Sequence, residues 1–347
     1  MNMIFKRKLP IPQDVKEMYP ISEEALRIKE NRDKELKAIL DGKDNRLILV
    51  IGPCSADRED SVMEYISRLA KIEKDVNDVL FIIPRVYTNK PRTTGEGYKG
   101  MLHQPDPLRQ SDLLKGIIAI RKLHMRALNE TEFSCADEML YPANHRYLSD
   151  ALGYVAVGAR SVENQEHRLT ASGLDLPVGL KNPTSGDLSV VFNALKAAQS
   201  GHTFIYRGWE VETKGNPYAH IILRGYKNSR GICHENYTYN NLKEVISMYK
   251  EGNFQHPAIL IDCNHNNSNK QYEKQIEIAN DVLESREKDP EVREFVKGLM
   301  IESYLEDGCQ HPDGTIYGKS ITDPCLGWEK SKALIYQIAD RLRKGGK

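Results

Sequence analysis

The sequence lacks an excess of either charge and any long apolar run. Lysine plus arginine number 49 and aspartate plus glutamate also number 49, so the formal net charge is zero. Without a global positive field the chain is not drawn to nucleic acid or to an anionic membrane, and any anion must be held by a local cluster. The longest apolar runs, such as Leu47–Ile51, fall far short of the roughly 18 residues that span a bilayer. The Lys-rich N-terminus has no apolar segment of a signal peptide after it. We therefore expect a cytoplasmic protein with neither nucleic acid nor membrane as partner.

The sequence also lacks paired cysteines, internal repeats and low-complexity tracts. Its six cysteines contain no C-x-x-C pair, so a disulfide scaffold or zinc ribbon is not expected and the thiols should be reduced. No repeat of 20 to 50 residues is visible, which excludes solenoids and propellers. Hydrophobic residues make up 40% of the chain and charged residues 28%, which excludes disordered and coiled-coil classes. The chain is expected to be globular.

What the sequence does contain is an alternation of short apolar runs with longer segments of helical periodicity. Eight runs predict strands: Leu47–Gly52, Leu80–Val86, Glu132–Ala136, Tyr154–Ala159, Val178–Lys181, Thr203–Tyr206, Ala258–Cys263 and Leu299–Ser303. The helices expected between them are Ser61–Glu73, Pro107–Leu128, His145–Leu152, Asn164–Ser172, Gly186–Ala198, Tyr239–Lys250 and Lys270–Glu287. Eight such units predict an α/β fold, a closed (β/α)8 TIM barrel, with a doubly wound sheet as the alternative.

Two segments are additions to a minimal barrel. Residues 1–45 form an N-terminal extension with a charged amphipathic helix at about Glu23–Leu40, and residues 46–347 form the barrel. Residues Glu210–Arg224 predict an extra β-hairpin around a Gly-Asn-Pro turn. Such additions usually serve oligomer contacts or regulation, although an arm that only plugs the bottom of the barrel is an equal alternative.

Positively charged residues collect at the carboxyl ends of the expected strands, the face on which barrel enzymes place their active sites. They are Arg85 after the second strand, Lys90 and Arg92 in the following loop with Thr93, Arg160 after the fourth strand, Lys181 ending the fifth, and Arg224 ending the hairpin. Converging cations repel one another unless anions neutralise them, so the site should bind substrates that carry several negative charges. Arginine suits bidentate recognition of phosphate or carboxylate.

A second set of residues at the same face has the donor atoms of a metal site. Cys54 follows the first strand, His265 the seventh, Glu302 ends the eighth, and Asp323 lies in the loop after it. The seventh, eighth and first strands are neighbours in a closed barrel, so one thiolate, one imidazole and two carboxylates can meet. This mixed set does not select one ion among zinc, Fe(II), Mn and Co. A buried thiol, a capping histidine and carboxylates that balance the cations remain the alternative.

Eight ordered segments carry a family resemblance. They read Gly-Pro-Cys-Ser, Lys-Pro-Arg-Thr, Gly-Ala-Arg-Ser, Gly-Leu-Lys-Asn, His-Ile-Ile-Leu-Arg-Gly, Ile-Asp-Cys-Asn-His-Asn-Asn-Ser-Asn-Lys-Gln, Met-Ile-Glu-Ser and Tyr-Gly-Lys-Ser-Ile-Thr-Asp-Pro-Cys-Leu-Gly-Trp-Glu. Together they resemble the type I alpha 3-deoxy-D-arabino-heptulosonate 7-phosphate (DAHP) synthases, from about Pro10 to the C-terminus.

The resemblance implies condensation of phosphoenolpyruvate with erythrose 4-phosphate, the first committed step of the shikimate pathway. By position, Arg160 and Arg224 match the residues that bind the phosphoenolpyruvate phosphate, Glu138 and Lys181 line that pocket, and Arg85 and Lys181 face the carboxylate. Lys90, Arg92 and Thr93 match the loop that takes the aldose phosphate, and Cys54, His265, Glu302 and Asp323 match the ligands of a divalent metal, Mn, Fe(II), Co or Zn. The catalytic residues expected on this basis are Lys90, His265 and Asp323, and a homodimer or homotetramer is expected.

The chain departs from the family pattern at positions linked to feedback control. The family often builds a pocket for an aromatic amino acid from the N-terminal extension and the turns near the fourth and fifth strands. His145 stands where feedback-sensitive relatives commonly have proline, and Asp175 where they commonly have serine. We expect weak or altered sensitivity to phenylalanine, unless Asp175 simply points to solvent or pairs with a lysine.

Two other functions are weighed against this one. A 3-deoxy-D-manno-octulosonate 8-phosphate synthase uses the same enol phosphate with arabinose 5-phosphate, but Lys-Pro-Arg-Thr differs from the loop usual in that family. A non-catalytic regulatory barrel would have lost a metal ligand or a phosphate-binding cation, and every one is present.

Overall fold

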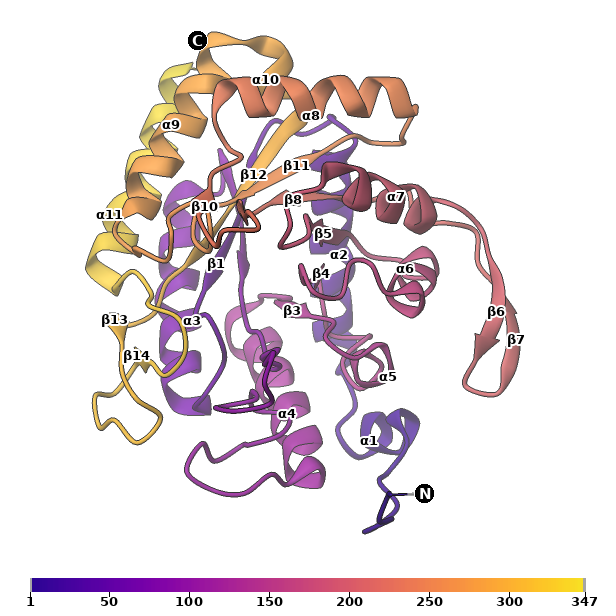
Figure 1. The fold of residues 1–347 in the computed structure, drawn as a ribbon. Helices are drawn as coiled ribbons and strands as arrows, with labels where there is room; N and C mark the ends of the chain where they lie inside the picture. The colour runs from indigo at the N-terminus through magenta and orange to yellow at the C-terminus, as the bar shows by residue number, and fades with distance from the viewer. Residues whose placement is uncertain (1, 346–347) are drawn as a thin grey trace.

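The computed structural model describes residues 2–345, and its centre is a barrel of eight parallel strands (Figure 1). In chain order these strands are β1 (Leu47–Gly52), β2 (Leu80–Pro84), β3 (Ala136–Glu138), β4 (Tyr154–Val157), β5 (Val178–Lys181), β8 (Ala219–Leu223), β11 (Ile259–Asp262) and β12 (Val296–Glu302). Hydrogen bonding runs in the order β2-β1-β12-β11-β8-β5-β4-β3, and a parallel bridge between Arg85 and Ala136 joins the two ends. The predicted TIM barrel is confirmed, and the doubly wound alternative is excluded.

The strands are apolar on both faces because both faces are covered. In β1, Ile48 and Val50 pack in the cluster inside the barrel, whereas Leu47, Leu49 and Ile51 pack in the cluster against the outer helices. The alternation follows from the two-residue period of a strand, and burial of both sides explains the continuous apolar run.

The outer layer consists of helices that follow the strands. The longer ones are α3 (Glu59–Val76), α4 (Leu113–Thr131), α6 (Gln165–Ser172), α7 (Leu188–Gln199), α8 (Tyr239–Gly252), α9 (Lys274–Lys288) and α11 (Trp328–Gly345), and two short ones are α5 (Pro142–His145) and α10 (Pro290–Phe295). Side chains of Asp112, Asn164, Asp187 and Thr238 accept N–H groups at the starts of α4, α6, α7 and α8.

Among the predicted boundaries that differ from the structure, two have a clear local reason. Glu132 does not begin a strand, because it ends α4 in the left-handed conformation with φ of 60°, and the third strand begins only at Ala136. The helix predicted at His145–Leu152 is wrong as well. Helix α5 starts earlier, with Pro142 in its first turn, and ends at His145. Proline is favoured at that first position because its fixed φ suits the helix and its missing N–H would have no partner there.

The sixth barrel strand was predicted in the wrong place. Thr203–Tyr206 is β6, which pairs antiparallel with β7 (Trp209–Glu212) in a hairpin that projects from the barrel (Figure 1). Its turn residues Arg207 and Gly208 both have positive φ, 58° and 77°, as the tight turn of a two-residue hairpin requires. The true sixth strand, β8, is fully buried, whereas β6 alternates exposed and half-buried residues. The predicted hairpin at Glu210–Arg224 therefore contains half of the real hairpin and the whole barrel strand.

The N-terminal segment closes one end of the barrel. Helix α1 (Pro12–Met18) is followed by α2 (Glu23–Leu40), whose Ser22 side chain accepts the N–H of Ala25 at 3.1 Å. Leu36, Ile39 and Leu40 of α2 pack in the same apolar cluster as the residues inside the barrel. Among residues 2–345, no helix has both the length and the apolar character needed to cross a membrane.

Small two-stranded ladders lie in the connections after the sixth and eighth barrel strands. They are β9 (Tyr226–Lys227) with β10 (Cys233–His234), and β13 (Glu306–Cys309) with β14 (Lys319–Ser320). The second ladder precedes the loop that carries Asp323, which returns the chain to the mouth of the barrel.

Candidate active site at the barrel mouth

A polar cavity of about 130 Å³ opens at the carboxyl ends of the strands. Nine of the site residues predicted from the sequence line it: Arg85, Lys90, Arg92, Glu138, Arg160, Lys181, Arg224, His265 and Asp323. Cys54 and Glu302 are buried beside this lining, and Thr93 is exposed in the loop after Arg92. Arg224 follows the barrel strand β8 rather than a hairpin, which is why it faces the same cavity as the cations of β4 and β5.

Arg85 connects the floor of the cavity to Glu302. Its guanidinium donates to a Glu302 carboxylate oxygen at 2.7 Å and to the carbonyl oxygens of Pro53 and Cys54 at 3.1 and 3.2 Å. Burial lowers the pKa of Arg85, but Glu302 together with Tyr87, Cys54 and Asp262 raises it more, so the pKa lies above its usual value. Burial likewise raises the pKa of Glu302, and Arg85, His265 and Lys90 together more than reverse this effect. Both groups are charged at neutral pH, with neither side chain more than 2% exposed.

Three of the four predicted metal ligands meet at one point. The Cys54 sulfur and one carboxylate oxygen each of Glu302 and Asp323 all lie within 4.8 Å of one another. Strand pairing causes this, because Gly52 of β1 lies opposite Glu302 of β12 in the register. A thiol and two carboxylates suit a divalent transition metal or zinc.

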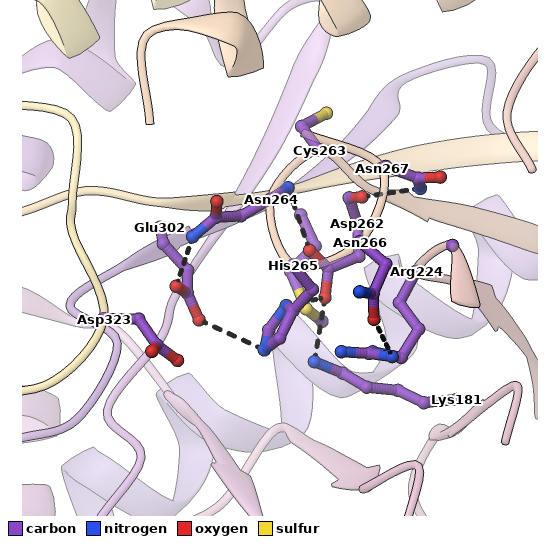
Figure 2. Close-up of polar contacts among 12 residues, drawn as sticks. Lys181, Arg224, Asp262, Cys263, Asn264, His265, Asn266, Asn267, Glu302 and Asp323 are labelled. Atoms are coloured by element: carbon purple, nitrogen blue, oxygen red, sulfur yellow. Dashed lines mark hydrogen bonds and ion pairs between the residues drawn. The ribbon is translucent and has the colours of Figure 1, made fainter. Parts of the chain in front are cut away.

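His265 lies next to this group without belonging to it. Figure 2 shows its ring between two carboxylates: Nδ1 lies 2.8 Å from an Asp262 oxygen and Nε2 lies 3.7 Å from a Glu302 oxygen. Burial lowers the pKa of His265, which favours the neutral form that binds metals. Its backbone has φ of 48°, an uncommon conformation outside glycine. A histidine with a carboxylate beside one ring nitrogen and the other ring nitrogen open has the arrangement of a metal ligand.

Lys90 bridges the thiol and the carboxylate of this group. Its ammonium lies 2.7 Å from the Cys54 sulfur and 2.9 Å from an Asp323 oxygen. Burial lowers the pKa of Lys90, but Cys54 and Asp323 together raise it above the ordinary value, so the amine carries a proton at neutral pH. Burial, followed by the Glu302 charge, raises the pKa of the Cys54 thiol to about 11. For Asp323, burial raises the pKa and the surrounding cations, Lys90 foremost, lower it far more.

The opposite wall of the cavity contains cations that lack a carboxylate partner. Neither Arg160 nor Arg224 forms an ion pair within residues 2–345, and in this part of the chain the Arg224 guanidinium donates only to the Asn266 amide oxygen, at 2.6 Å. Burial lowers the pKa of Arg224, and the nearby charge of Arg160 lowers it further. Two neighbouring guanidinium groups without a protein counter-charge form a binding site for a dianion such as phosphate.

Sequence reasoning missed three residues that organise this site. Asp262 ends β11, and its carboxylate accepts from the buried Lys181 ammonium at 2.9 Å while facing His265 (Figure 2). Asn264 donates to Glu302 at 2.5 Å, and Lys270 donates to Asp323 at 2.7 Å and lines the cavity. A carboxylate that directly follows the apolar run Ile-Leu-Ile was the available signal for Asp262. Asn264 and Lys270 lie in the polar segment that carries His265, but spacing alone does not show where they point.

The loop that carries Lys90 is anchored from behind by Asp137. The Asp137 carboxylate accepts from the Thr88 amide at 2.8 Å and from the Thr88 hydroxyl at 2.5 Å. Burial raises the pKa of Asp137 to about 7. Because Thr88 precedes Lys90 by two residues, this anchor restrains the position of the ammonium.

A second thiol lies beside the proposed metal ligand. The Cys54 amide donates to the Cys325 sulfur at 3.4 Å, and both residues are buried free cysteines. Cys325 thus lies close to Cys54, as its position two residues after Asp323 suggests.

Comparison with known proteins agrees with the geometry. The model of the DAHP synthetase I family matches residues 18–335. A curated relative from Haemophilus influenzae, "Phospho-2-dehydro-3-deoxyheptonate aldolase", is 38% identical over 94% of this chain and 89% of its own. The "Phospho-2-dehydro-3-deoxyheptonate aldolase, Phe-sensitive" of Escherichia coli K12 is 37% identical over 97% of this chain and 95% of its own.

The fold comparison covers even more of the chain. A solved structure titled "Structure of Phospho-2-dehydro-3-deoxyheptonate aldolase from Francisella tularensis SCHU S4" has a TM-score of 0.91 and 31% identity, and covers 99% of both chains. The function predicted from the motifs, a 3-deoxy-7-phosphoheptulonate synthase and hence a transferase, is thereby confirmed. The chain belongs to the DAHP synthetase I family.

Proposed function

We propose that this chain condenses phosphoenolpyruvate with erythrose 4-phosphate in the cytoplasm, and that the residues of the barrel mouth carry the reaction. One observation supports this assignment above all. The cavity combines two arginines that form no ion pair with the described residues on one wall with the thiol-carboxylate group and Lys90 on the other. A site of this kind can bind a phosphorylated enol and present it to an aldehyde.

Phosphoenolpyruvate would bind across the cavity. Arg160 and Arg224 bind its phosphate, because neither forms an ion pair with a protein carboxylate within residues 2–345. Arg85 and Lys181 face its carboxylate, each already oriented by a buried acid, and Glu138 lines the same pocket. Fixing both ends of the substrate aligns C3 of the enol for attack and removes part of the entropic cost of the reaction.

A divalent ion, Mn, Fe(II), Co or Zn, would be held by Cys54, His265, Glu302 and Asp323. When bound, it would act as a Lewis acid that polarises the aldehyde of erythrose 4-phosphate. The fit rests on the convergence of the three donor atoms and on the open ring nitrogen of His265 that faces them.

Lys90 and its partners would supply the proton chemistry. As the new carbon–carbon bond forms between C3 of phosphoenolpyruvate and C1 of the aldose, the ammonium of Lys90 donates a proton to the developing alkoxide. Asp323 holds this donor at 2.9 Å and is thus a catalytic partner, with His265 close by. Water then adds to C2, and cleavage of the C–O bond of the resulting hemiketal phosphate releases inorganic phosphate.

Release of inorganic phosphate tests the proposal. Phosphoenolpyruvate is mixed with erythrose 4-phosphate, with arabinose 5-phosphate, or with no aldose. The proposal expects phosphate only with the four-carbon sugar. Phosphate with arabinose 5-phosphate instead would favour the octulosonate synthase, and none in any mixture would favour the regulatory barrel.

Specificity for the aldose phosphate should depend on the loop after Lys90. The Arg92 side chain donates to the Tyr98 carbonyl oxygen at 2.8 Å and lines the cavity. Thr93, the next residue of the loop, is exposed. Arg92→Ala should raise KM for erythrose 4-phosphate about tenfold or more, the value of one charge-assisted hydrogen bond, with little change for phosphoenolpyruvate. Steady-state kinetics with each substrate varied measures this split, and equal increases for both substrates would contradict the role of the loop.

Feedback control is proposed to be weak towards phenylalanine. Asp175 is fully exposed and pairs with Lys37 of α2 at 2.8 Å, which is the alternative of a pairing with a lysine. The Lys37 charge and the solvent therefore screen any repulsion between Asp175 and the carboxylate of a bound amino acid. His145, in contrast, is 7% exposed, and the cavity that it lines has a volume of only about 10 Å³. No amino acid fits there without displacement of the ring.

Inhibition curves for phenylalanine, tyrosine and tryptophan at subsaturating phosphoenolpyruvate measure this directly. We expect His145→Pro to increase inhibition by phenylalanine and the matched Asp175→Ser to change it little. Micromolar inhibition of the unaltered enzyme by phenylalanine would show that the pocket is intact.

A homodimer or homotetramer is proposed from exposed apolar side chains on the two additions to the barrel. Ile205 and Trp209 of the β6–β7 hairpin are 83% and 74% exposed, and Phe5 in the N-terminal extension, residues 1–45, is 88% exposed. Analytical ultracentrifugation of the protein and of the Trp209→Lys variant measures the oligomeric state. A protein that is a monomer with and without the substitution would contradict the proposal.

A further inference from the structure

A second cavity, of about 700 Å³, lies at the opposite end of the barrel from the catalytic mouth. It is lined by the segments that precede β1 and β2, the start of β12, the end of α9, the short helix α10 and the end of α11. Figure 1 shows α9, α10 and the C-terminal end of the chain together at one end of the molecule. The amino ends of the strands face this cavity, so it shares no residue with the active site.

Most charged residues around the cavity are already paired. Arg46 pairs with Asp44, Arg341 with Glu287, and Asp78 with Arg343, the last from outside the lining. The lining residues without an ion pair within residues 2–345 are the cations Arg286, Arg293 and Lys297 and the carboxylate Glu294. The lining therefore carries a surplus of positive charge.

Lys297 and Arg293 each donate to a carbonyl oxygen in the last turn of a helix, whereas the Arg286 side chain has no such partner among residues 2–345. The Lys297 ammonium donates to the Ile39 carbonyl oxygen at 3.1 Å, in the last turn of α2, where a cation stabilises the helix dipole. Arg286 is only 7% exposed, and its Nε atom is buried without a hydrogen-bond partner among residues 2–345. Arg293 donates to the Arg286 carbonyl oxygen at 3.2 Å, which holds the two residues together.

A buried guanidinium without an anion is costly. Burial and the neighbouring Arg293 lower the pKa of Arg286 to about 10, so the group is still charged at neutral pH. The cavity also has apolar surface, from the exposed Pro290 of α10 and from the half-buried Leu342 of α11. Its volume is in the range of pockets that take small organic molecules.

We propose that this cavity is a binding site for a small organic anion, with its phosphate or carboxylate head on Arg286 and Arg293 and its apolar body on Pro290 and Leu342. The ligand supplies the counter-charge that Arg286 lacks, and its apolar part covers the surface between α10 and α11. The site is separate from the proposed reaction and does not depend on it.

Calorimetric titration at low ionic strength tests this proposal with two probes, phenyl phosphate and benzoate. The parent protein carries Arg160→Ala and Arg224→Ala, so that the phosphate site of the mouth does not contribute. We expect saturable binding of at least one probe, and the stronger probe identifies the head group. Arg286→Met and, separately, the exposed Arg293→Gln should each weaken that binding about tenfold or more, the value of one charge-assisted hydrogen bond.

Lys288→Gln is the matched control, because the exposed Lys288 at the end of α9 pairs with Glu284 and neither of these residues lines the cavity. It should bind like the parent. Circular dichroism identifies any variant that fails to fold, and Arg293→Gln keeps the proposal testable if Arg286→Met is unstable. Absence of binding for both probes, or equal binding in the parent and in Arg293→Gln, would overturn the proposal. Phosphate release by the enzyme with an intact mouth is measured separately, so the two proposals fail independently.

Discussion

Cys54→Ala is expected to lower both the bound metal and the turnover of the enzyme by about a hundredfold or more. The variant removes one of the three donor atoms that converge within 4.8 Å, and even the loss of a group that only orients a ligand typically costs 10- to 100-fold in metal affinity or activity. Chelation should likewise abolish phosphate release, and a divalent ion should restore it. Metal content is measured by elemental analysis beside the kinetics.

The chain offers a matched control for this experiment. Cys263 is a buried thiol directly after β11, and Figure 2 shows its sulfur pointing away from the carboxylates. Cys263→Ala should keep both metal and activity. Asn264→Ala, which removes the hydrogen bond to Glu302, should have an intermediate effect. Full activity in metal-stripped protein would show that the thiol-carboxylate group has another role.

Lys90→Met is expected to lower kcat by roughly 10²- to 10⁴-fold, the range of a general acid. The ammonium lies between the Cys54 sulfur and an Asp323 oxygen, so its removal takes a competing cation away from the proposed metal ligands. Metal content should therefore be unchanged or higher while turnover falls, which distinguishes this variant from Cys54→Ala.

Lys99→Met serves as the control for Lys90. The Lys90 amide donates to the Lys99 carbonyl oxygen, but Lys99 does not line the cavity. We expect near-normal kcat for this variant. A loss in Lys90→Met that appears only in KM would assign Lys90 to substrate binding rather than to proton transfer.

Part of the barrel could be predicted from local sequence because the signals are local. A parallel strand that is covered on both sides has a continuous apolar run, and β1, β5 and β11 were found in this way within a residue or two of their ends. The sixth strand was misplaced, since Thr203–Tyr206 is as β-prone as Ala219–Leu223. Only burial distinguishes them, because β6 lies in an exposed hairpin and β8 inside the sheet.

The sequence by itself determined the family and predicted which residues lie at the barrel mouth, through ordered motifs and through the rule that polar residues after barrel strands face the active site. Only the tertiary structure decided how they combine. Cys54 and Asp323 are 269 residues apart and meet because β1 and β12 are neighbours in a closed barrel. The ion pair of Asp262 with Lys181 likewise depends on a contact between distant segments, and the burial of Arg286 without an ion pair among residues 2–345 depends on the packing around the second cavity. The spacing of residues along the sequence does not show either feature, because both arise only when distant parts of the chain pack together in the folded barrel.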